Sequence, residues 1–336
     1  MELGKFPAAL LERMLANNRI TDPRVVLGPG VGEDAAALDM GDRLLVVKSD
    51  PITFATDSIG WYAVQVNAND VACTGAIPKW FLATILVPQS FSESQGEAVF
   101  DQVVEACAGL GITLVGGHSE VTHGIDRPIV MGSMLGEVDR DRLVRTGGAQ
   151  DGDSVVVTKG VAIEGIALLA RERRQALLDK GVPAEIIEKA SMYLTNPGIS
   201  VVNDARIAIE SVEVHSLHDV TEGGIATGLR EVAIASGLGV GVEEDSIPVL
   251  PECREICAAL GLDPLGLLAS GAMLVTLPAI EAPRLLSALE SEGIDAYEIG
   301  QMLDPSEGLQ MIGREGEAPL PEFARDELAR FFSESQ

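Results

Sequence analysis

Apolar segments of two kinds alternate along this 336-residue chain, and their alternation restricts the folds that it can adopt. Short runs rich in valine, isoleucine and leucine, such as RLLVVK at 43–48 and KWFLATILV at 79–87, are typical of strands. Between and after them, the segments 60–75 and 92–109 carry apolar residues at helical spacing. Further strands are expected at 112–115 and 128–138. This order excludes an all-helical protein and predicts an α/β or α+β fold.

A short polar, glycine-rich segment at 145–153 interrupts the alternation and predicts a domain boundary. A chain of this length is expected to form two domains. After the boundary we expect strands at 154–159, 240–243, 271–277 and 296–302, an extended segment at 212–217, and helices at 162–173, 174–192, 199–211, 223–236, 251–260, 281–292 and 319–333. We place an N-terminal domain at 1–148, a C-terminal α/β domain at 149–315 and a helical tail at 316–336.

The excess of acidic residues limits the partners of this chain. Asp and Glu number 51 against 24 Lys and Arg, which gives a formal net charge of −27. Nucleic acids and anionic membranes are bound through basic surfaces, so neither is an expected partner. The N-terminal segment 1–15 is predicted to be an amphipathic helix rather than a signal peptide, and no transmembrane helix is expected. Four scattered cysteines do not form a disulfide framework. We therefore expect a cytoplasmic protein.

A glycine-rich loop at 23–40 opens onto the acids Glu33 and Asp34, which follow Gly32. Glycine lets backbone N–H groups approach phosphate oxygens, and carboxylates beside them can hold Mg²⁺. The spacing matches neither the dinucleotide fingerprint nor a Walker loop. An ordinary turn with two solvated acids is the alternative interpretation.

Short polar residues follow the first predicted strand and interrupt the first predicted helix. Asp50 comes directly after the strand, while Asn67, Asn69 and Asp70 lie in the apolar segment 60–75. Such side chains lower helix propensity, and their burial is costly without partners. Asn and Asp oxygens suit Mg²⁺, so the helical residues indicate a site. Asp50 alone is also explained as a cap of a turn.

A glycine pair, Gly116 and Gly117, follows the predicted strand at 112–115 and precedes His118. A strand that runs into Gly-Gly and polar residues is a familiar pattern of ligand-binding loops. A hydrogen-bonding role is expected for His118, because no further His or Cys lies at ligand spacing apart from His123. A zinc hydrolase that uses these two histidines is the alternative.

A second glycine pair, Gly223 and Gly224, follows Asp219 and Thr221 and starts a predicted helix. The N–H groups at a helix N-terminus bind anions, although a cap by Asp219 or Thr221 uses the same donors. Carboxylates bind phosphate only through a metal such as Mg²⁺. A magnesium nucleotide therefore explains the acidic clusters, and Lys48 or Lys159 is placed to neutralise a transferring phosphoryl group.

In this order and spacing the motifs resemble those of the aminoimidazole ribonucleotide (AIR) synthase-related superfamily, whose fold is called PurM-like. The superfamily includes AIR synthase, thiamine-monophosphate kinase, selenophosphate synthetase and HypE, the hydrogenase expression/formation protein. The resemblance spans about residues 25–305 and is greatest to HypE-like proteins. The motifs are Gly32-Glu33-Asp34-Ala-Ala, Lys48-Ser-Asp50, Asn69-Asp70-Val-Ala-Cys-Thr-Gly75-Ala, Val115-Gly116-Gly117-His118-Ser, Asp151-Gly-Asp153 and Asp219-Val-Thr-Glu-Gly223-Gly224.

The resemblance implies a two-domain fold, in which the N-terminal domain contributes strands to the β-barrel of a homodimer. It implies an ATP-dependent enzyme that binds ATP and Mg²⁺ and activates or phosphorylates an acceptor, either a small molecule or one carried by a protein. The metal-binding residues would be Asp34, Asp50 and Asp70. The catalytic residues would be Asp50, Asp70 and Asp219. The cofactor-binding residues would be Gly32, Lys48, Asn69, Gly116, Gly117, Thr221, Gly223 and Gly224, with the loop around Thr221 closing on the site.

Two departures from the HypE pattern keep other functions open. HypE carries a C-terminal cysteine that receives a carbamoyl group, whereas the last cysteine of this chain is Cys257. His118 stands where the family usually has an acid. These departures count against the hydrogenase-maturation reaction in that form. The alternatives are a nucleotide-binding regulator or scaffold without turnover, and a small-molecule kinase similar to thiamine-monophosphate kinase.

Overall fold

The computed structural model describes residues 6, 8–30, 32–53, 55 and 57–334, and the structural statements below concern these residues. They divide into two compact units with one sheet each. The N-terminal unit comprises Arg19–Pro29 and Asp34–Leu143. The C-terminal unit comprises Met1–Asn18, Gly30–Glu33 and Val144–Gln336. The expected mixed α/β fold is confirmed, and no described helix is long and apolar enough to cross a membrane.

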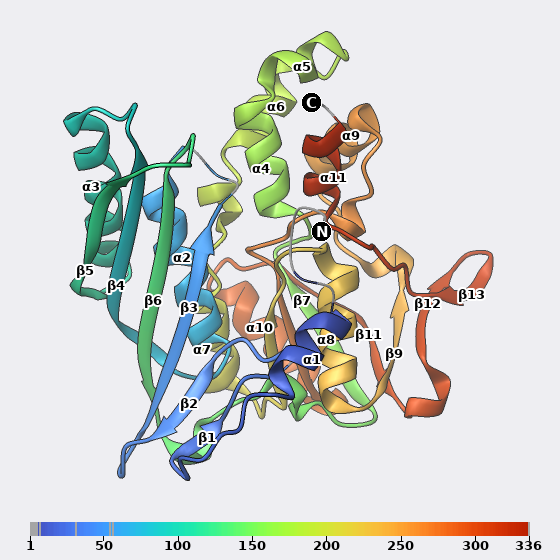
Figure 1. Cartoon of the computed structure of the whole chain (residues 1–336). Helices are drawn as coiled ribbons and strands as arrows, with labels where there is room; N and C mark the ends of the chain where they lie inside the picture. Colours follow the sequence, from blue (N-terminus) through green and yellow to red (C-terminus); the bar gives the residue numbers. More distant parts are fainter. Residues whose placement is uncertain (1–5, 7, 31, 54, 56, 335–336) are drawn as a thin grey trace. The chain divides into compact units, whose positions relative to one another are not determined.

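The N-terminal unit is built on a six-stranded sheet with the strand order β1-β2-β3-β6-β4-β5 (Figure 1). Its strands are β1 (Val25–Leu27), β2 (Ala36–Asp39), β3 (Leu44–Ile52), β4 (Ile77–Pro88), β5 (Thr113–Thr122) and β6 (Ile129–Val138). Only β4 and β5 pair in parallel, and the other neighbours are antiparallel. This mixed sheet provides the platform for the helices that follow β3 and β4.

Two helices, α2 (Ile59–Ala72) and α3 (Glu93–Gly109), cover this sheet. Helix α2 packs on β3, β6 and β4, and α3 packs against α2. Every residue of α2 except Trp61 is buried. Its polar residues therefore lie inside the unit, where each needs a partner. Gly60 allows the close helix contact, since a Cβ there would lie 2.4 Å from the carbonyl oxygen of Val99.

The C-terminal unit is built on a seven-stranded sheet with the strand order β13-β12-β9-β11-β7-β10-β8. Its strands are β7 (Asp153–Thr158), β8 (Ser216–Asp219), β9 (Gly239–Glu243), β10 (Met273–Pro278), β11 (Ala296–Leu303), β12 (Leu309–Gly313) and β13 (Gly316–Pro319). Its helices are α1 (Ala8–Leu15), α4 (Ile163–Glu172), α5 (Arg174–Asp179), α6 (Ala184–Ser191), α7 (Val202–Ser211), α8 (Gly224–Ser236), α9 (Pro251–Leu260), α10 (Ala282–Ser291) and α11 (Glu327–Glu334).

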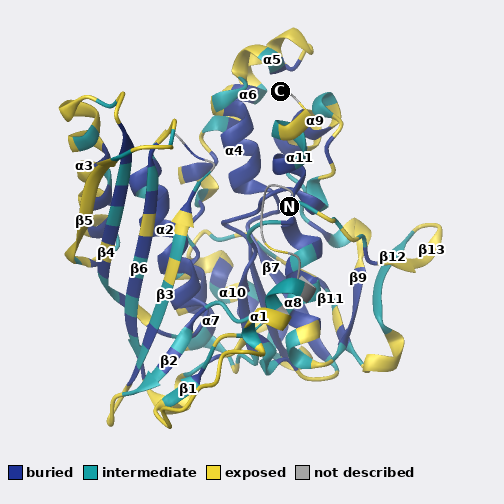
Figure 2. Cartoon of the chain, in the orientation of Figure 1, coloured by how far each residue is buried: buried dark blue, intermediate teal, exposed yellow. Residues whose placement is uncertain are grey.

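The core of the C-terminal unit lies on the central strands, which are apolar over almost their whole length. All six positions of β7 are buried, and Figure 2 shows this strand in dark blue. Val155 and Val157 of β7 pack in one cluster with Leu274 of β10 and Ile299 of β11. Burial on both faces explains why these strands have continuous apolar sequences rather than alternating ones. The four cysteines of the chain are also buried, as free thiols.

Two loops of the sequence-based prediction are wrong in the N-terminal unit. The strand expected to end at 115 continues as β5 through the glycine pair, because Gly116 and Gly117 pair with Leu82 and Ala83 of β4. The loop expected at 23–40 contains the short strands β1 and β2. Glycine-rich segments without alternation of apolar and polar residues give little local indication of a strand. In both cases the segment is a strand because it pairs with a neighbouring strand.

Two helix predictions need correction in the C-terminal unit, and a third is confirmed in the part that the structure describes. The helix predicted at 174–192 is two helices, α5 and α6, separated at Gly181 and Pro183. The helix predicted at 319–333 is helical only from Glu327, and the preceding residues include the end of β13. The predicted N-terminal helix begins at Ala8 in the described part, and residues 1–5 and 7 lie outside it.

Candidate functional site

Lys48 and Asp70 form an ion pair inside the N-terminal unit. Lys48 is on β3 and Asp70 is on α2, which packs on that strand. The Nζ atom of Lys48 lies 3.1 Å from Oδ1 of Asp70, whose exposed fraction is only 3%. A buried carboxylate needs a nearby cation or strong donors to stay ionised. The ammonium group of Lys48 therefore balances the charge of the buried Asp70 carboxylate.

Asn67 fixes the backbone of β3 at Asp50, one of the predicted site residues. Its Oδ1 accepts the N–H of Asp50 at 2.9 Å, and its Nδ2 donates to the carbonyl oxygen of Asp50 at 3.2 Å. Strand β2 pairs with β3 only as far as Val47, and no other described strand pairs with β3 on this side beyond that point. The side-chain amide of Asn67 takes the place of the missing strand. Gly132 of β6 leaves room for it, because a Cβ there would lie 2.4 Å from Nδ2 of Asn67.

Two of the three predicted metal ligands come together in the N-terminal unit. Asp34, just before β2, and Asp70 each offer a carboxylate oxygen, and these oxygens lie within 4.8 Å of one another. No group of three potential ligands at this spacing contains Asp50 among the described residues. Mg²⁺ is usually held by one or two carboxylates together with substrate phosphates and water. The donor set of Asp34 and Asp70 therefore fits Mg²⁺, while the role of Asp50 stays a prediction.

The other predicted residues of the N-terminal unit are placed on α2 and β5. Asn69 is fully buried on α2. Gly117 brings two backbones together, because a Cβ there would lie 1.9 Å from the carbonyl oxygen of Ala83. A Cβ at Gly116 would meet nothing within 4 Å. The structure thus gives Gly117 a packing reason that is independent of any phosphate, and the predicted cofactor role of both glycines stays a prediction.

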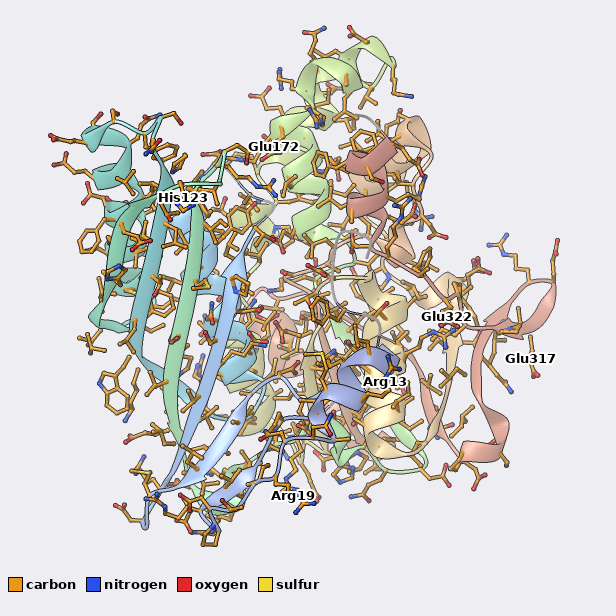
Figure 3. All side chains as sticks on the ribbon, viewed as in Figure 1. Arg13, Arg19, His123, Glu172, Glu317 and Glu322 are labelled. Atoms are coloured by element: carbon orange, nitrogen blue, oxygen red, sulfur yellow. The ribbon has the colours of Figure 1, made fainter. Side chains whose placement is uncertain are left out.

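The histidines after this glycine pair do not form a metal centre in the described part of the chain. Nε2 of His118 lies 3.1 Å from Oε2 of Glu120, and both side chains are exposed. His123 lies just beyond the end of β5 and is exposed (Figure 3). Neither belongs to a described group of three or more potential metal ligands. The hydrogen-bonding interpretation of His118 therefore agrees with the geometry.

In the C-terminal unit the predicted loop at 219–224 connects β8 to α8. Asp219 ends β8 and is buried. Gly223 and Gly224 have φ values of +82° and +64°, which favour glycine. The carbonyl oxygen of Thr221 accepts the N–H groups of Gly224 and Ala269, each at 3.2 Å. The backbone of this loop is therefore defined by glycine conformation and by contacts with the segment before β10.

The expected cap of α8 comes from elsewhere in the chain. Helix α8 has no capping bond from the side chain of its N-cap residue, Gly223. Instead the N–H of Gly223 donates to Oδ2 of Asp326 at 2.6 Å. Asp326 is separated from Gly223 by 103 residues and lies just before α11. From the sequence we expected the N–H groups at this helix start to bind an anion. In the structure the N–H of Gly223 is bonded to a carboxylate of the chain itself.

Two buried acids of the C-terminal unit escaped the sequence analysis. The pKa of Glu164 is raised to about 7, chiefly by burial and also by the negative charges of Asp326, Glu222 and Asp219, while a hydrogen bond from Ser270 lowers it. Burial raises the pKa of Asp326 to about 6, against the N–H donors of the backbone. Glu164 had one local signal, an acid in the first turn of a predicted helix. Asp326 had none, because its partner is distant in sequence.

Two further predicted residues lie in the C-terminal unit. Gly32 has a φ of +84°, and a Cβ there would lie 3.2 Å from the carbonyl oxygen of Glu231 on α8. Lys159 is buried, and its Nζ lies 3.0 Å from Oδ1 of Asp204 and 2.6 Å from the carbonyl oxygen of Ser200. This ion pair gives Lys159 a structural role within its unit.

Comparisons with known proteins identify the same regions of the chain. Residues 32–138 match the family model described as AIR synthase related protein, N-terminal domain, and residues 150–311 match its C-terminal domain. A Methanocaldococcus jannaschii protein named for hydrogenase expression/formation is 28% identical over 322 residues, which cover 93% of this chain and 92% of that protein. The carbamoyl dehydratase HypE of Cupriavidus necator is 28% identical over 284 residues, covering 81% and 77%.

Solved structures show the same fold. HypE of Escherichia coli superposes with a TM-score of 0.75 at 24% identity, covering 96% of this chain and 98% of that one. A HypE structure in complex with ATP gives 0.68 at 24% identity, covering 90% and 92%. AaThiL, complexed with AMPPCP and TMP, gives 0.71 at 20% identity, covering 94% of each chain.

Proposed function

Because this chain belongs to the AIR synthase related family, we propose that it is an enzyme that binds ATP with Mg²⁺ and activates or phosphorylates an acceptor. Two similar solved structures, named for HypE and AaThiL, contain ATP or AMPPCP, which supports the choice of nucleotide. The observation that carries the proposal is the group of Lys48, Asp34 and the buried Asp70 in the N-terminal unit.

Each residue of this group has a distinct task in the proposed reaction. Asp34 and Asp70 would hold Mg²⁺, which when bound neutralises the charge of the nucleotide phosphates. Lys48 holds the Asp70 carboxylate in place and adds a positive charge next to it. Asn67 fixes the β3 backbone that carries Lys48 and Asp50. For Asp219, Thr221 and the glycines of their loop we keep the predicted roles in catalysis and nucleotide binding.

The test of this proposal is calorimetric titration of Mg-ATP into the protein, combined with analysis of the nucleotide products. We expect Asp34→Asn and Asp70→Asn each to weaken Mg-ATP binding by at least about tenfold, because each removes a charge from the metal ligands. Asp42→Asn is the matched control, since Asp42 is an exposed aspartate between β2 and β3. Binding that neither site variant weakens would contradict the assignment, provided that both variants remain folded.

Product analysis separates the remaining functions. ADP formed with a phosphorylated acceptor indicates a kinase, as expected from the likeness to AaThiL, which was crystallised with TMP. ATP consumption that depends on a carbamoyl or other carbonyl acceptor indicates the activity for which the HypE relatives are named carbamoyl dehydratases. Binding without consumption under any of these conditions indicates a nucleotide-binding regulator or scaffold.

The proposal also includes a cytoplasmic homodimer and an acceptor that is small or carried by a protein. One similar structure is a complex of HypE with HypF, which supports a protein partner. The edge strand β5 is exposed along most of its length, including Val115 and Val121, which supports strand pairing with a second copy. Sedimentation equilibrium tests this part, and a monomer at micromolar concentration would contradict it.

A further inference from the structure

The C-terminal segment, residues 320–334, contacts the rest of the C-terminal unit at several points. Leu320 and Leu328 are buried. The Nη2 atom of Arg230 on α8 donates to the carbonyl oxygen of Leu320 at 2.6 Å. Oε2 of Glu327 accepts the N–H of Asp263 at 3.0 Å. These contacts are distributed over the segment, so its position does not depend on any single residue.

One side chain of this segment reaches the loop at 219–224. Oδ2 of Asp326 accepts the N–H of Gly223, while its Oδ1 accepts the N–H of Leu328 at 2.7 Å. The exposed fraction of Asp326 is 6%. One carboxylate therefore joins the start of α8 to the start of α11.

The loop needs an anchor of this kind because its own sequence defines its conformation weakly. Gly223 and Gly224 are consecutive and both left-handed, and glycine populates many other conformations at little cost. Space is also restricted, since a Cβ on Gly224 would lie 2.4 Å from the carbonyl oxygen of Leu265. A buried hydrogen bond to a carboxylate is among the stronger constraints available to a backbone N–H group.

We propose that Asp326 is a positioning residue that holds the 219–224 loop in its binding conformation through the N–H of Gly223. This inference rests on the proposed function, in which the loop binds nucleotide. It assigns the C-terminal segment a second task beyond packing. Its carboxylate sets the loop geometry from a distant part of the sequence, and Glu327, its neighbour, only docks the segment.

The test compares Asp326→Ala and Asp326→Asn with Glu327→Ala. Glu327→Ala removes the contacts with Asp263 and Arg330 but leaves the bond to Gly223. Two measurements are made on the full-length protein: hydrogen–deuterium exchange of peptides that cover 219–226 without nucleotide, and calorimetric affinity for Mg-ATP. The melting temperature of each variant establishes that it is folded under the conditions used.

We expect Asp326→Ala to speed exchange in the loop and to weaken Mg-ATP binding by about tenfold, the effect of one charge-assisted hydrogen bond. Asp326→Asn keeps an oxygen acceptor, so its loop exchange and its affinity for Mg-ATP should lie between those of Asp326→Ala and the parent protein. Glu327→Ala should change neither by more than about twofold.

Three outcomes would overturn the inference. Equal losses of affinity in Asp326→Ala and Glu327→Ala would show that the segment acts only through packing. Unchanged affinity in Asp326→Ala would show that the loop does not need this anchor. Unchanged exchange would show that Asp326 does not hold the loop. If the unsubstituted protein binds no Mg-ATP, the proposed function itself fails, and the exchange measurement still decides whether Asp326 holds the loop.

Discussion

The side-chain amide of Asn67 joins α2 to the backbone of β3. It bonds both backbone groups of Asp50 and also the carbonyl oxygen of Ala63, at 2.8 Å. We expect Asn67→Ala to lower the free energy of unfolding by about 3 kcal/mol, because it leaves buried backbone groups without partners. Urea denaturation measures this loss. Asn17→Ala removes one bond of an exposed side chain and should cost less than about 0.5 kcal/mol. Equal losses would contradict the role of Asn67.

Glu164 makes stability depend on pH through its raised pKa of about 7. The unfolded chain releases this proton at its ordinary pKa of 4.5, so between these values the folded state holds more protons. Stability therefore falls as pH rises from about 4.5 to 7, by about 3 kcal/mol in total. Asp326, with a pKa of about 6, acts in the same direction.

The matching variant is Glu164→Gln, which has no proton to lose. Between pH 5 and 8 we expect the denaturation midpoint of the variant to change less than that of the parent protein. Relative to the parent protein, the variant should therefore be more stable at pH 8 than at pH 5. Glu322→Gln, on an exposed side chain, provides the control. A steeper pH dependence in Glu164→Gln would contradict the assignment.

At the scale of elements, β5 offers a matched pair of glycines. Gly116 and Gly117 have similar φ values, +158° and +149°, so alanine is strained to a similar degree at both. Only at Gly117 would the added Cβ meet the backbone of β4. We expect Gly117→Ala to cost at least about 2 kcal/mol more than Gly116→Ala in urea denaturation. Equal losses in the free energy of unfolding would show that β4 and β5 can move apart to accommodate the added methyl group. The comparison also separates packing from nucleotide binding, because binding can be measured in the same two variants.

The elements that could be predicted from the sequence are those whose own residues show the apolar pattern of a helix or a strand. The apolar spacing of α2 and the continuous valines of β7 locate these elements within a few residues. The polar residues Asn67 and Asp70 of α2 contact β3, and the site that they indicated there stays a prediction. Structure that depends on a distant partner had no such signal. Strand β5 extends through two glycines because β4 lies beside it, and the start of α8 is capped by Asp326.

At the scale of the whole molecule, the net charge of −27 opposes the compact state. Salt screens this repulsion, with a Debye length that falls to about 3 Å at 1 M. We expect the melting temperature at pH 7.5 to rise by about 5 °C from low salt to about 0.5 M NaCl. Near pH 4 about half of the carboxylates are protonated, so the rise should be smaller. A rise of equal size at both pH values would contradict the electrostatic explanation.

The burial of all four cysteines has a practical consequence for fluorescence work. Burial raises the pKa of Cys107 to about 11, so this thiol stays protonated and slow to alkylate at neutral pH. Cysteines introduced at exposed positions, such as Glu105→Cys on α3 and Glu290→Cys on α10, would therefore be the fast-reacting sites. A donor dye on one unit and an acceptor dye on the other would then report the distance between the two labelled positions. The native sequence is thus a ready background for single-molecule spectroscopy.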